Sequence, residues 1–144
     1  MIAVDTNILI YAHRGESPFH ARAVRALDDL AASGRPWGTV WQCVHEFAAI
    51  VTHPKIFQPA STLEECLREI GNWRACSTFR CIAEGATHWQ ALERVLREGK
   101  VRGPLVHDAR IAAVCLAHGV EEFWSVDRDF SRFPQIRVVN PLAA

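Results

Sequence analysis

The first seven residues, MIAVDTN, constrain the fold of this chain more than any other stretch. Four apolar residues at positions 1–4 are followed at once by Asp5, Thr6 and Asn7. A short apolar run bounded by polar residues is typical of a strand buried on both faces, as in a parallel sheet. Because open α/β sheets bind ligands beyond the carboxyl ends of their strands, Asp5 is a candidate functional acid. The alternative is that Asp5 only caps the helix that follows.

Strand-like runs and helical stripes alternate along the rest of the chain. Apolar residues around Phe47 recur at positions i, i+3, i+4 and i+7, which indicates a helix. Residues 104–118, closed by Gly119, are apolar almost all round, which predicts a helix buried deep in the protein. Further strands are expected at residues 37–41, 79–82, 123–126 and 136–139. The alternation predicts one α/β domain over residues 1–144, with a central parallel sheet of about five strands and helices on both faces.

Capping residues predict where three of the helices begin. Ser17 followed by Pro18 predicts an N-cap and a first helical residue. Two capping boxes are expected, formed by Ser61 with Glu64 and by Thr87 with Gln90.

Composition excludes several classes of protein. The five cysteines are odd in number and include no C-x-x-C pair, so neither a disulfide framework nor a structural zinc site is indicated. No apolar run approaches the ~20 residues of a membrane span, and Asp5 interrupts the first run too early for a signal peptide, so we expect a cytoplasmic protein with no membrane partner. Sixteen Lys and Arg residues balance sixteen Asp and Glu residues, so any nucleic-acid binding must come from a local patch or from metal ions held by acids.

Several carboxylates occupy positions that suit a functional site. Asp5 and Asp127 each end a predicted strand, and Asp108 lies in the first two turns of the most apolar helix. Taken singly, each acid also has an ordinary explanation. Asp108 could pair with Arg110 or another neighbour, or could interact with the dipole at the start of its helix. Asp127 could form a turn, and Glu46 could lie on a solvated helix face.

Taken together, the acids predict a metal site. Two strand ends and a helix start can converge on one crevice of an α/β sheet. Carboxylates that lie this close repel one another, so either one is protonated or a divalent cation lies between them. Hard oxygen ligands suit Mg²⁺ or Mn²⁺, and such an ion supports hydrolysis of phosphodiester bonds.

Three motifs also carry a family resemblance: VDTNILIYA, HDARIAAVCLAHG and FWSVDRDFSRFPQIRVVNP. In this order, and over essentially the whole chain, they resemble the PIN domain, and specifically the VapC-type ribonuclease toxins of prokaryotic toxin–antitoxin pairs. The resemblance implies a PIN-like fold and an endoribonuclease that depends on Mg²⁺ or Mn²⁺. It also implies a homodimer and a cognate antitoxin that blocks the active site.

The resemblance assigns roles to individual residues. The acids expected to hold the metal and to carry out catalysis are Asp5, Glu46, Asp108 and Asp127. Asp129 is a second choice for the last of these acids, and the sequence does not separate the two. The supporting polar residues are Thr6, Asn7 and Ser125.

Four further residues near the predicted acids are candidate contacts to RNA phosphates: His13, Arg14, His107 and Arg128. Solvated charges at the rim of the site are the alternative interpretation of each.

Two other functions stay open at this stage. A catalytically silent PIN-like module would only bind a partner protein, and the presence of all four acids counts against it. A phosphoacceptor domain of the response-regulator kind normally has paired acids early and a lysine late. Here the first strand ends in a single acid, and neither Lys55 nor Lys100, the only lysines, follows a strand.

Overall fold

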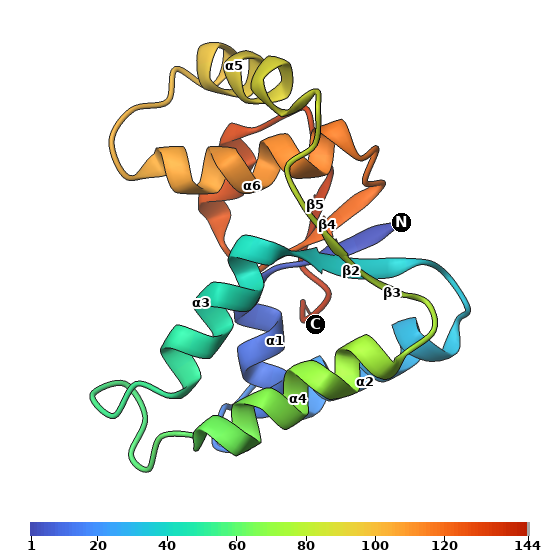
Figure 1. Ribbon diagram of the computed structural model, residues 1–144, viewed down its shortest axis with the longest axis vertical. Helices are drawn as coiled ribbons and strands as arrows, with labels where there is room; N and C mark the ends of the chain where they lie inside the picture. The colour runs from blue at the N-terminus through green and yellow to red at the C-terminus, as the bar shows by residue number, and fades with distance from the viewer. Residues whose placement is uncertain (144) are drawn as a thin grey trace.

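A computed structural model, which describes residues 1–143, confirms the predicted α/β architecture (Figure 1). The sheet has five strands in the order β3-β2-β1-β4-β5, and every pairing is parallel. The strands are β1 (Ile2–Val4), β2 (Trp37–Val40), β3 (Phe79–Ile82), β4 (Glu122–Trp124) and β5 (Val138–Val139). Because β1 is central and all strands run the same way, the residues after each strand meet at one edge of the sheet.

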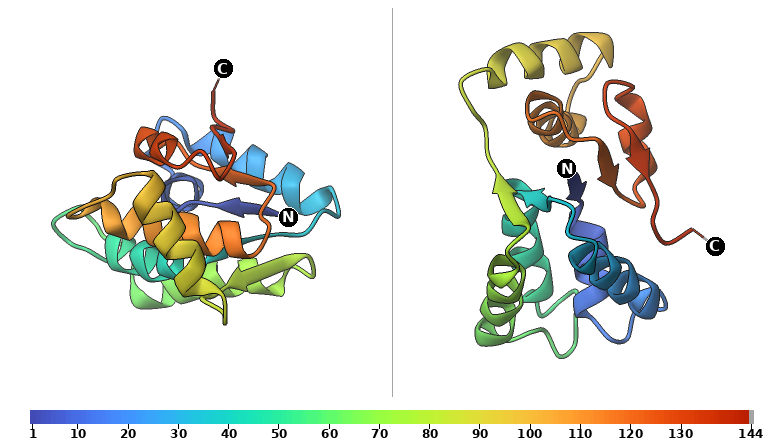
Figure 2. Two further views of the ribbon diagram at one scale, coloured as in Figure 1. Left: turned by 90° about the horizontal axis from the view of Figure 1, so that it is seen from above. Right: turned by 90° about the vertical axis from the view of Figure 1, so that its right-hand side faces the viewer.

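Helices cover both faces of the sheet (Figure 2). The first face packs on α1, α2, α4 and most of α3, and the second packs on α5 and α6. The helices are α1 (Thr6–His13), α2 (His20–Ala32), α3 (Trp41–Val51), α4 (Leu63–Ala75), α5 (His88–Glu98) and α6 (Leu105–Ala117), and a short 3₁₀ helix, η1, spans Arg128–Arg132.

The apolar opening of the chain is divided between the two cores. Ile2 and Val4 pack into the core on the side of α1 and α2, whereas Ala3 packs into the core on the side of α5 and α6. This follows from the alternation of side chains along a strand. The α6 helix is apolar nearly all round because the sheet lies against it on one side and α5 on another, as the buried run Ile111–Cys115 indicates.

All five predicted strands are present, but most of them begin or end at other residues than predicted. The strand at 79–82 has the predicted bounds, but the strand at 37–41 ends at Val40, and Trp41 begins α3. The last two strands are shorter than predicted, at residues 122–124 and 138–139. Among residues 1–143 no helix is both long and apolar enough to cross a membrane.

The predicted helix starts are partly wrong. The α2 helix begins at His20 rather than Pro18, and the Ser17 hydroxyl accepts the Phe19 N–H in a local turn instead of capping the helix. Thr87 is the N-cap residue of α5, but its side chain makes no capping hydrogen bond.

The capping box of α4 is displaced by one residue from the prediction. It is formed by Thr62 and Glu65, whose side chains bond to each other's backbone N–H groups at 3.1 and 2.9 Å. The sequence satisfies the same spacing at Ser61 and Glu64, so local pattern alone does not separate the two registers. Ser61 is instead buried against His13, a tertiary contact that decides the register.

Gly38 provides a test of how closely the central strands approach each other. A Cβ at this position would lie 1.7 Å from the backbone oxygen of Arg80 on the neighbouring strand. We expect Gly38→Ala to lower the free energy of unfolding by about 3 kcal/mol or more, because two paired backbones cannot both move aside. Urea unfolding measures this change.

Gly71 supplies the matched control. It lies in α4 with no atom within 4 Å of an added Cβ, so Gly71→Ala should stabilise the protein by about 0.5–1 kcal/mol. If Gly38→Ala were as stable as the wild type, the strand packing described here would be wrong.

Candidate metal centre

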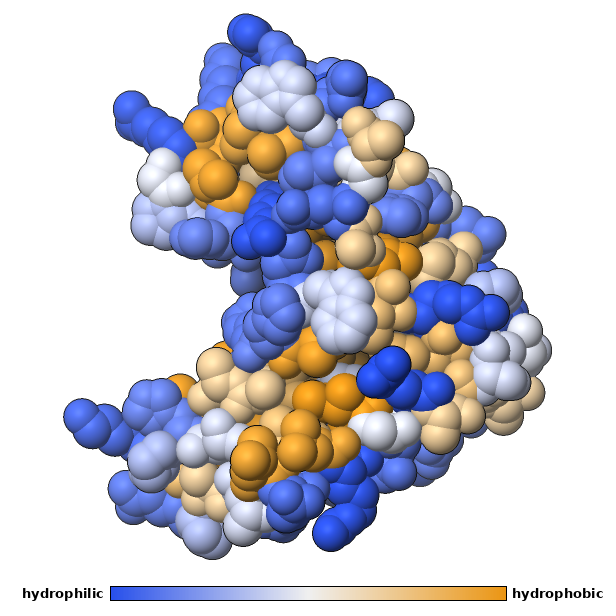
Figure 3. Space-filling view, viewed as in Figure 1, coloured by the Kyte–Doolittle hydropathy of each residue, from blue (hydrophilic) through white to orange (hydrophobic). Residues whose placement is uncertain are grey.

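The structure brings all four predicted acids to one cavity of about 150 Å³. The cavity lies beyond the end of β1, where α1, α3, α6 and η1 meet, at the carboxyl edge of the sheet. Figure 3 shows a notch in the molecular surface between the lobe of α5 and α6 and the lobe of α3 and α4. The residues that line the cavity are Asp5, Thr6, Asn7, Ile10, Glu46, Ile50, Asp108, Ile111, Asp127 and Phe130.

Asp5 both caps a helix and faces the cavity. It is the N-cap residue of α1, and its Oδ1 accepts the Thr6 N–H at 2.8 Å. Its Oδ2 accepts the Ser125 hydroxyl at 2.6 Å. Burial, together with a smaller effect of the nearby charge of Glu46, raises the pKa of Asp5 to about 6, in spite of hydrogen bonds from Ser125 and Thr6 that favour ionisation. Asp5 therefore caps the helix and also faces the cavity, so the two interpretations of its role in the sequence are compatible.

Asp108 belongs to a second group of acids. One carboxylate oxygen from each of Asp108, Asp127 and Asp129 lies within 4.8 Å of the others. Partial burial and, to a smaller extent, repulsion from Asp127 and Asp129 raise the pKa of Asp108 to about 6. The predicted pairing of Asp108 with Arg110 is wrong, because Arg110 pairs with Glu84 instead. Asp108 does lie in the first turn of α6, where the helix dipole favours an acid.

Asp127 and Asp129 differ in how they are held. Asp127 is half-buried, lines the cavity and is the N-cap residue of η1, where its Oδ1 accepts the Asp129 N–H at 2.9 Å. Asp129 is exposed and does not line the cavity. Both carboxylates lie close to that of Asp108. Because only Asp127 lines the cavity, it is the better candidate for the fourth acid, and Asp129 remains the second choice.

The three supporting residues connect the acids to one another. Ser125 is buried after β4, donates to Asp5 and accepts the Asp127 N–H at 3.0 Å. The Thr6 hydroxyl donates to Glu46 at 3.3 Å. The Asn7 amide nitrogen donates to Asp5 at 3.3 Å. Short polar side chains thus hold the carboxylates of Asp5 and Glu46 and the backbone of Asp127.

The sequence reasoning missed one neighbour of Asp5. The thiol of Cys43, buried on α3, lies 3.7 Å from Asp5 Oδ1 and points its hydrogen toward it. Burial raises the pKa of this thiol to about 12, so it remains a neutral donor. Its spacing was the available signal, because Cys43 and Glu46 are three residues apart and therefore share one side of the helix.

The donor set fits a hard divalent cation. Within residues 1–143 no Lys or Arg forms an ion pair with any acid of this group, including Asp129. The Asn7 Oδ1 atom is buried and accepts no hydrogen bond from any described residue. Carboxylates that lack a counter-charge, together with an amide oxygen that lacks a donor, suit Mg²⁺ or Mn²⁺ and their bound waters.

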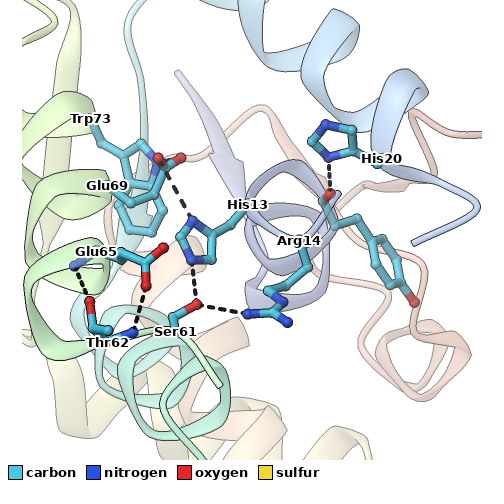
Figure 4. Close-up of polar contacts among 9 residues, drawn as sticks. His13, Arg14, His20, Ser61, Thr62, Glu65, Glu69 and Trp73 are labelled. Carbon is cyan, nitrogen blue, oxygen red and sulfur yellow. Dashed lines mark hydrogen bonds and ion pairs between the residues drawn. The ribbon is translucent and has the colours of Figure 1, made fainter. Parts of the chain in front are cut away.

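Two of the predicted RNA contacts are engaged elsewhere (Figure 4). The His13 ring lies between Ser61, 2.8 Å from Nε2, and Glu69, 3.9 Å from Nδ1. The Arg14 guanidinium donates to Ser61 at 3.1 Å and to the Pro59 carbonyl at 2.9 Å. Both side chains fix the loop between α3 and α4, so they are not free to contact a substrate. His107 and Arg128, in contrast, are exposed beside Asp108 and Asp127.

Comparison with known proteins reveals clear relatives. A family model described as the PIN domain matches residues 2–136. Ribonuclease VapC48 of Mycobacterium tuberculosis is 30% identical over 139 residues, which cover 96% of each chain. Ribonuclease VapC31 of the same species is 30% identical over 144 residues, covering 98% of this chain and 99% of its own.

Solved structures share the fold. The sarcin–ricin loop cleaving toxin VapC20 of Mycobacterium tuberculosis matches with a TM-score of 0.66 at 21% identity, over 95% of this chain and 99% of its own. VapBC2 from Rickettsia felis, bound to a DNA fragment from its promoter, matches with a TM-score of 0.70 at 17% identity. The match covers 97% of this chain and 98% of the other.

The raised pKa of Asp108 predicts how stability depends on pH. The folded state holds this proton more tightly than the unfolded state does, so its ionisation lowers stability as the pH rises from about 4 to about 6. We expect Asp108→Asn, in EDTA, to raise the free energy of unfolding at neutral pH by on the order of 1 kcal/mol, after allowance for solvent screening. Urea unfolding across this pH range measures the gain, which should vanish near pH ~4.

Asp29→Asn is the control for this measurement, since Asp29 is exposed on α2, away from the acids. It should produce no such gain. A destabilised Asp108→Asn, or a gain that is independent of pH, would show that Asp108 does not lie in a repulsive group.

Proposed function

This chain belongs to the PIN domain family, and from that premise we propose that it is a metal-dependent endoribonuclease, the toxin of a toxin–antitoxin pair. The observation that carries the proposal is that four carboxylates line one cavity. In the described part of the chain, no Lys or Arg forms an ion pair with any of them. Relatives that match over almost their whole length are ribonucleases by name, which supports the same reaction here. The phosphoacceptor alternative has no support from this family.

Asp5, Asp108 and Asp127 are the proposed ligands of Mg²⁺ or Mn²⁺, directly or through water, and Glu46 completes the site. A bound ion of this kind lowers the pKa of a water molecule and neutralises charge on the phosphodiester. The chain itself orients the acids: Ser125 holds Asp5, and the Thr6 hydroxyl holds Glu46. Asp129 remains the alternative to Asp127 because its carboxylate lies in the same group.

The carboxylates also determine which substrates can enter. Without a cation, a group of this charge repels a phosphate, so binding of the ion and of RNA should reinforce each other. His107 and Arg128 are exposed at the rim and are the proposed contacts to RNA phosphates beside the cleaved bond.

The proposed partners are an RNA substrate, a cognate antitoxin and a second copy of this chain, with the cytoplasm as the place of action. The solved relatives support the antitoxin, since they include VapBC2 from Rickettsia felis and a toxin–antitoxin complex from Klebsiella pneumoniae. We assign all of these functions to a single domain that spans residues 1–144.

Asp5→Asn and Asp108→Asn should each reduce RNA cleavage by about a hundredfold or more, because loss of a ligand costs at least as much as loss of a ligand's supporting contact. Asn can still cap α1 in place of Asp5, so the fold should persist. Cleavage of labelled cellular RNA in the presence of Mg²⁺ or Mn²⁺, with EDTA as the blank, measures the effect.

Asp29→Asn should cleave like the wild type. Separate Asp127→Asn and Asp129→Asn variants decide which of these acids belongs to the site. Wild-type cleavage by Asp108→Asn would show that the assignment of the acids is wrong.

A further inference from the structure

A second cavity, of about 790 Å³, has three cations among its six lining residues. Lys100 and Arg102 come from the loop between α5 and α6, and Arg132 comes from the end of η1. The one acid in its lining is Glu98, and both of its carboxylate oxygens already accept hydrogen bonds, from Arg94 and Gln135. The cavity therefore presents net positive charge.

The 790 Å³ cavity, called the basic cavity below, and the cavity of the four acids, called the acidic cavity, share two elements, α6 and η1. Leu105 lines the basic cavity, and Asp108, one helical turn later on the same side of α6, lines the acidic one. Along η1, Phe130 lines the acidic cavity and Arg132 the basic one. Figure 1 shows the α5–α6 loop at the same end of the molecule as the start of α6, and Figure 3 shows hydrophilic side chains projecting from that end.

The backbone of the α5–α6 loop is held in place. The Gly99 N–H donates to Val95 at 3.0 Å, the Val101 N–H donates to Leu96 at 3.0 Å, and Arg132 donates to the Gly99 carbonyl at 3.4 Å. Gly99 is buried, and a Cβ there would lie 3.0 Å from the Val95 carbonyl. The loop thus presents the exposed side chains that follow Gly99 from a fixed backbone.

The cations of this cavity also lack acidic partners. Four other arginines of this half of the chain pair with glutamates: Arg94 with Glu98, Arg97 with Glu93, Arg110 with Glu84 and Arg137 with Glu122. Three more, Arg74, Arg80 and Arg128, form no ion pair with a described residue. Lys100, Arg102 and Arg132 form no ion pair with any residue in 1–143. Like charges gathered without counter-charges repel one another, and a polyanion relieves that repulsion.

We propose that Lys100, Arg102 and Arg132 bind the phosphate backbone of single-stranded RNA next to the acidic cavity. This inference rests on the proposed function, since it gives the substrate a second point of attachment. The acids repel phosphates, so affinity for RNA must come from cations close by. A single strand suits the site because a positively charged surface beside a reactive site can follow one phosphate backbone. Contacts of this kind position the strand and do not read its sequence.

The test uses the Asp108→Asn chain, which should bind RNA without cleaving it, as the parent. A short, fluorescently labelled single-stranded RNA of mixed sequence is titrated by anisotropy in EDTA at a series of KCl concentrations. The logarithm of the binding constant should fall linearly with the logarithm of salt concentration. Adding Lys100→Gln with Arg102→Gln should reduce the slope by about 1.4, because each phosphate contact to a single strand contributes about 0.7. Arg132→Gln alone should reduce it by about half as much.

The matched control is Lys55→Gln with Arg25→Gln. It also removes one exposed lysine and one exposed arginine that lack an acidic partner in the described part of the chain. The control should leave the slope unchanged, and thermal unfolding followed by circular dichroism checks that each variant is folded.

An equal loss of slope in both double variants, or no loss in either, would overturn the basic RNA site. The proposed function would still stand if the chain with native Asp108 cleaved the same RNA in the presence of Mg²⁺ or Mn²⁺. A parent that bound no RNA would overturn the basic site, and absence of cleavage by the native chain with either ion present would overturn the proposed function separately.

Discussion

The carboxylate of Asp5 lies at the end of the central strand with only 6% of the residue's surface exposed, where burial opposes its ionisation. Three elements are tied to it at short range: α1 through the Thr6 N–H, the end of β4 through Ser125, and α3 through the Cys43 thiol. Each donor stabilises the ionised form, yet the pKa remains raised because burial outweighs the three contacts. The fold therefore supports a carboxylate that still gains from a further positive charge.

Charged groups that lack a partner of opposite charge also gather elsewhere in the described part of the molecule. Within residues 1–143, acids without cations gather at the carboxyl edge of the sheet, and cations without acids gather around the loop between α5 and α6. Exchanging partners between these groups would improve the electrostatic energy of the isolated chain, so stability alone does not explain their separation. Under the proposed function, a divalent cation would satisfy one group and RNA phosphates would satisfy the other.

The sequence predicted the features that depend on buried apolar periodicity and on strand ends. The central strand, the parallel sheet, the buried α6 helix and the convergence of Asp5, Asp108 and Asp127 follow from patterns of that kind, whereas Glu46 was assigned by the family resemblance. Features decided by tertiary contacts were missed. Ser61 and Thr62 satisfy the same capping pattern, and only the packing of His13 selects between them. Arg14 was predicted to contact RNA from its position near the acids, but the direction of its side chain depends on a loop more than forty residues away.

The most direct test of the metal centre is calorimetric titration of Mn²⁺ into the metal-stripped chain, with Asp108→Asn and Asp29→Asn measured beside it. We predict that the wild type and Asp29→Asn bind the ion and that Asp108→Asn loses this binding. Equal affinity in the wild type and Asp108→Asn would contradict the assignment, because Asp108 would then contribute nothing to holding the ion. Absence of binding to all three chains would contradict the claim that these carboxylates hold a metal on their own.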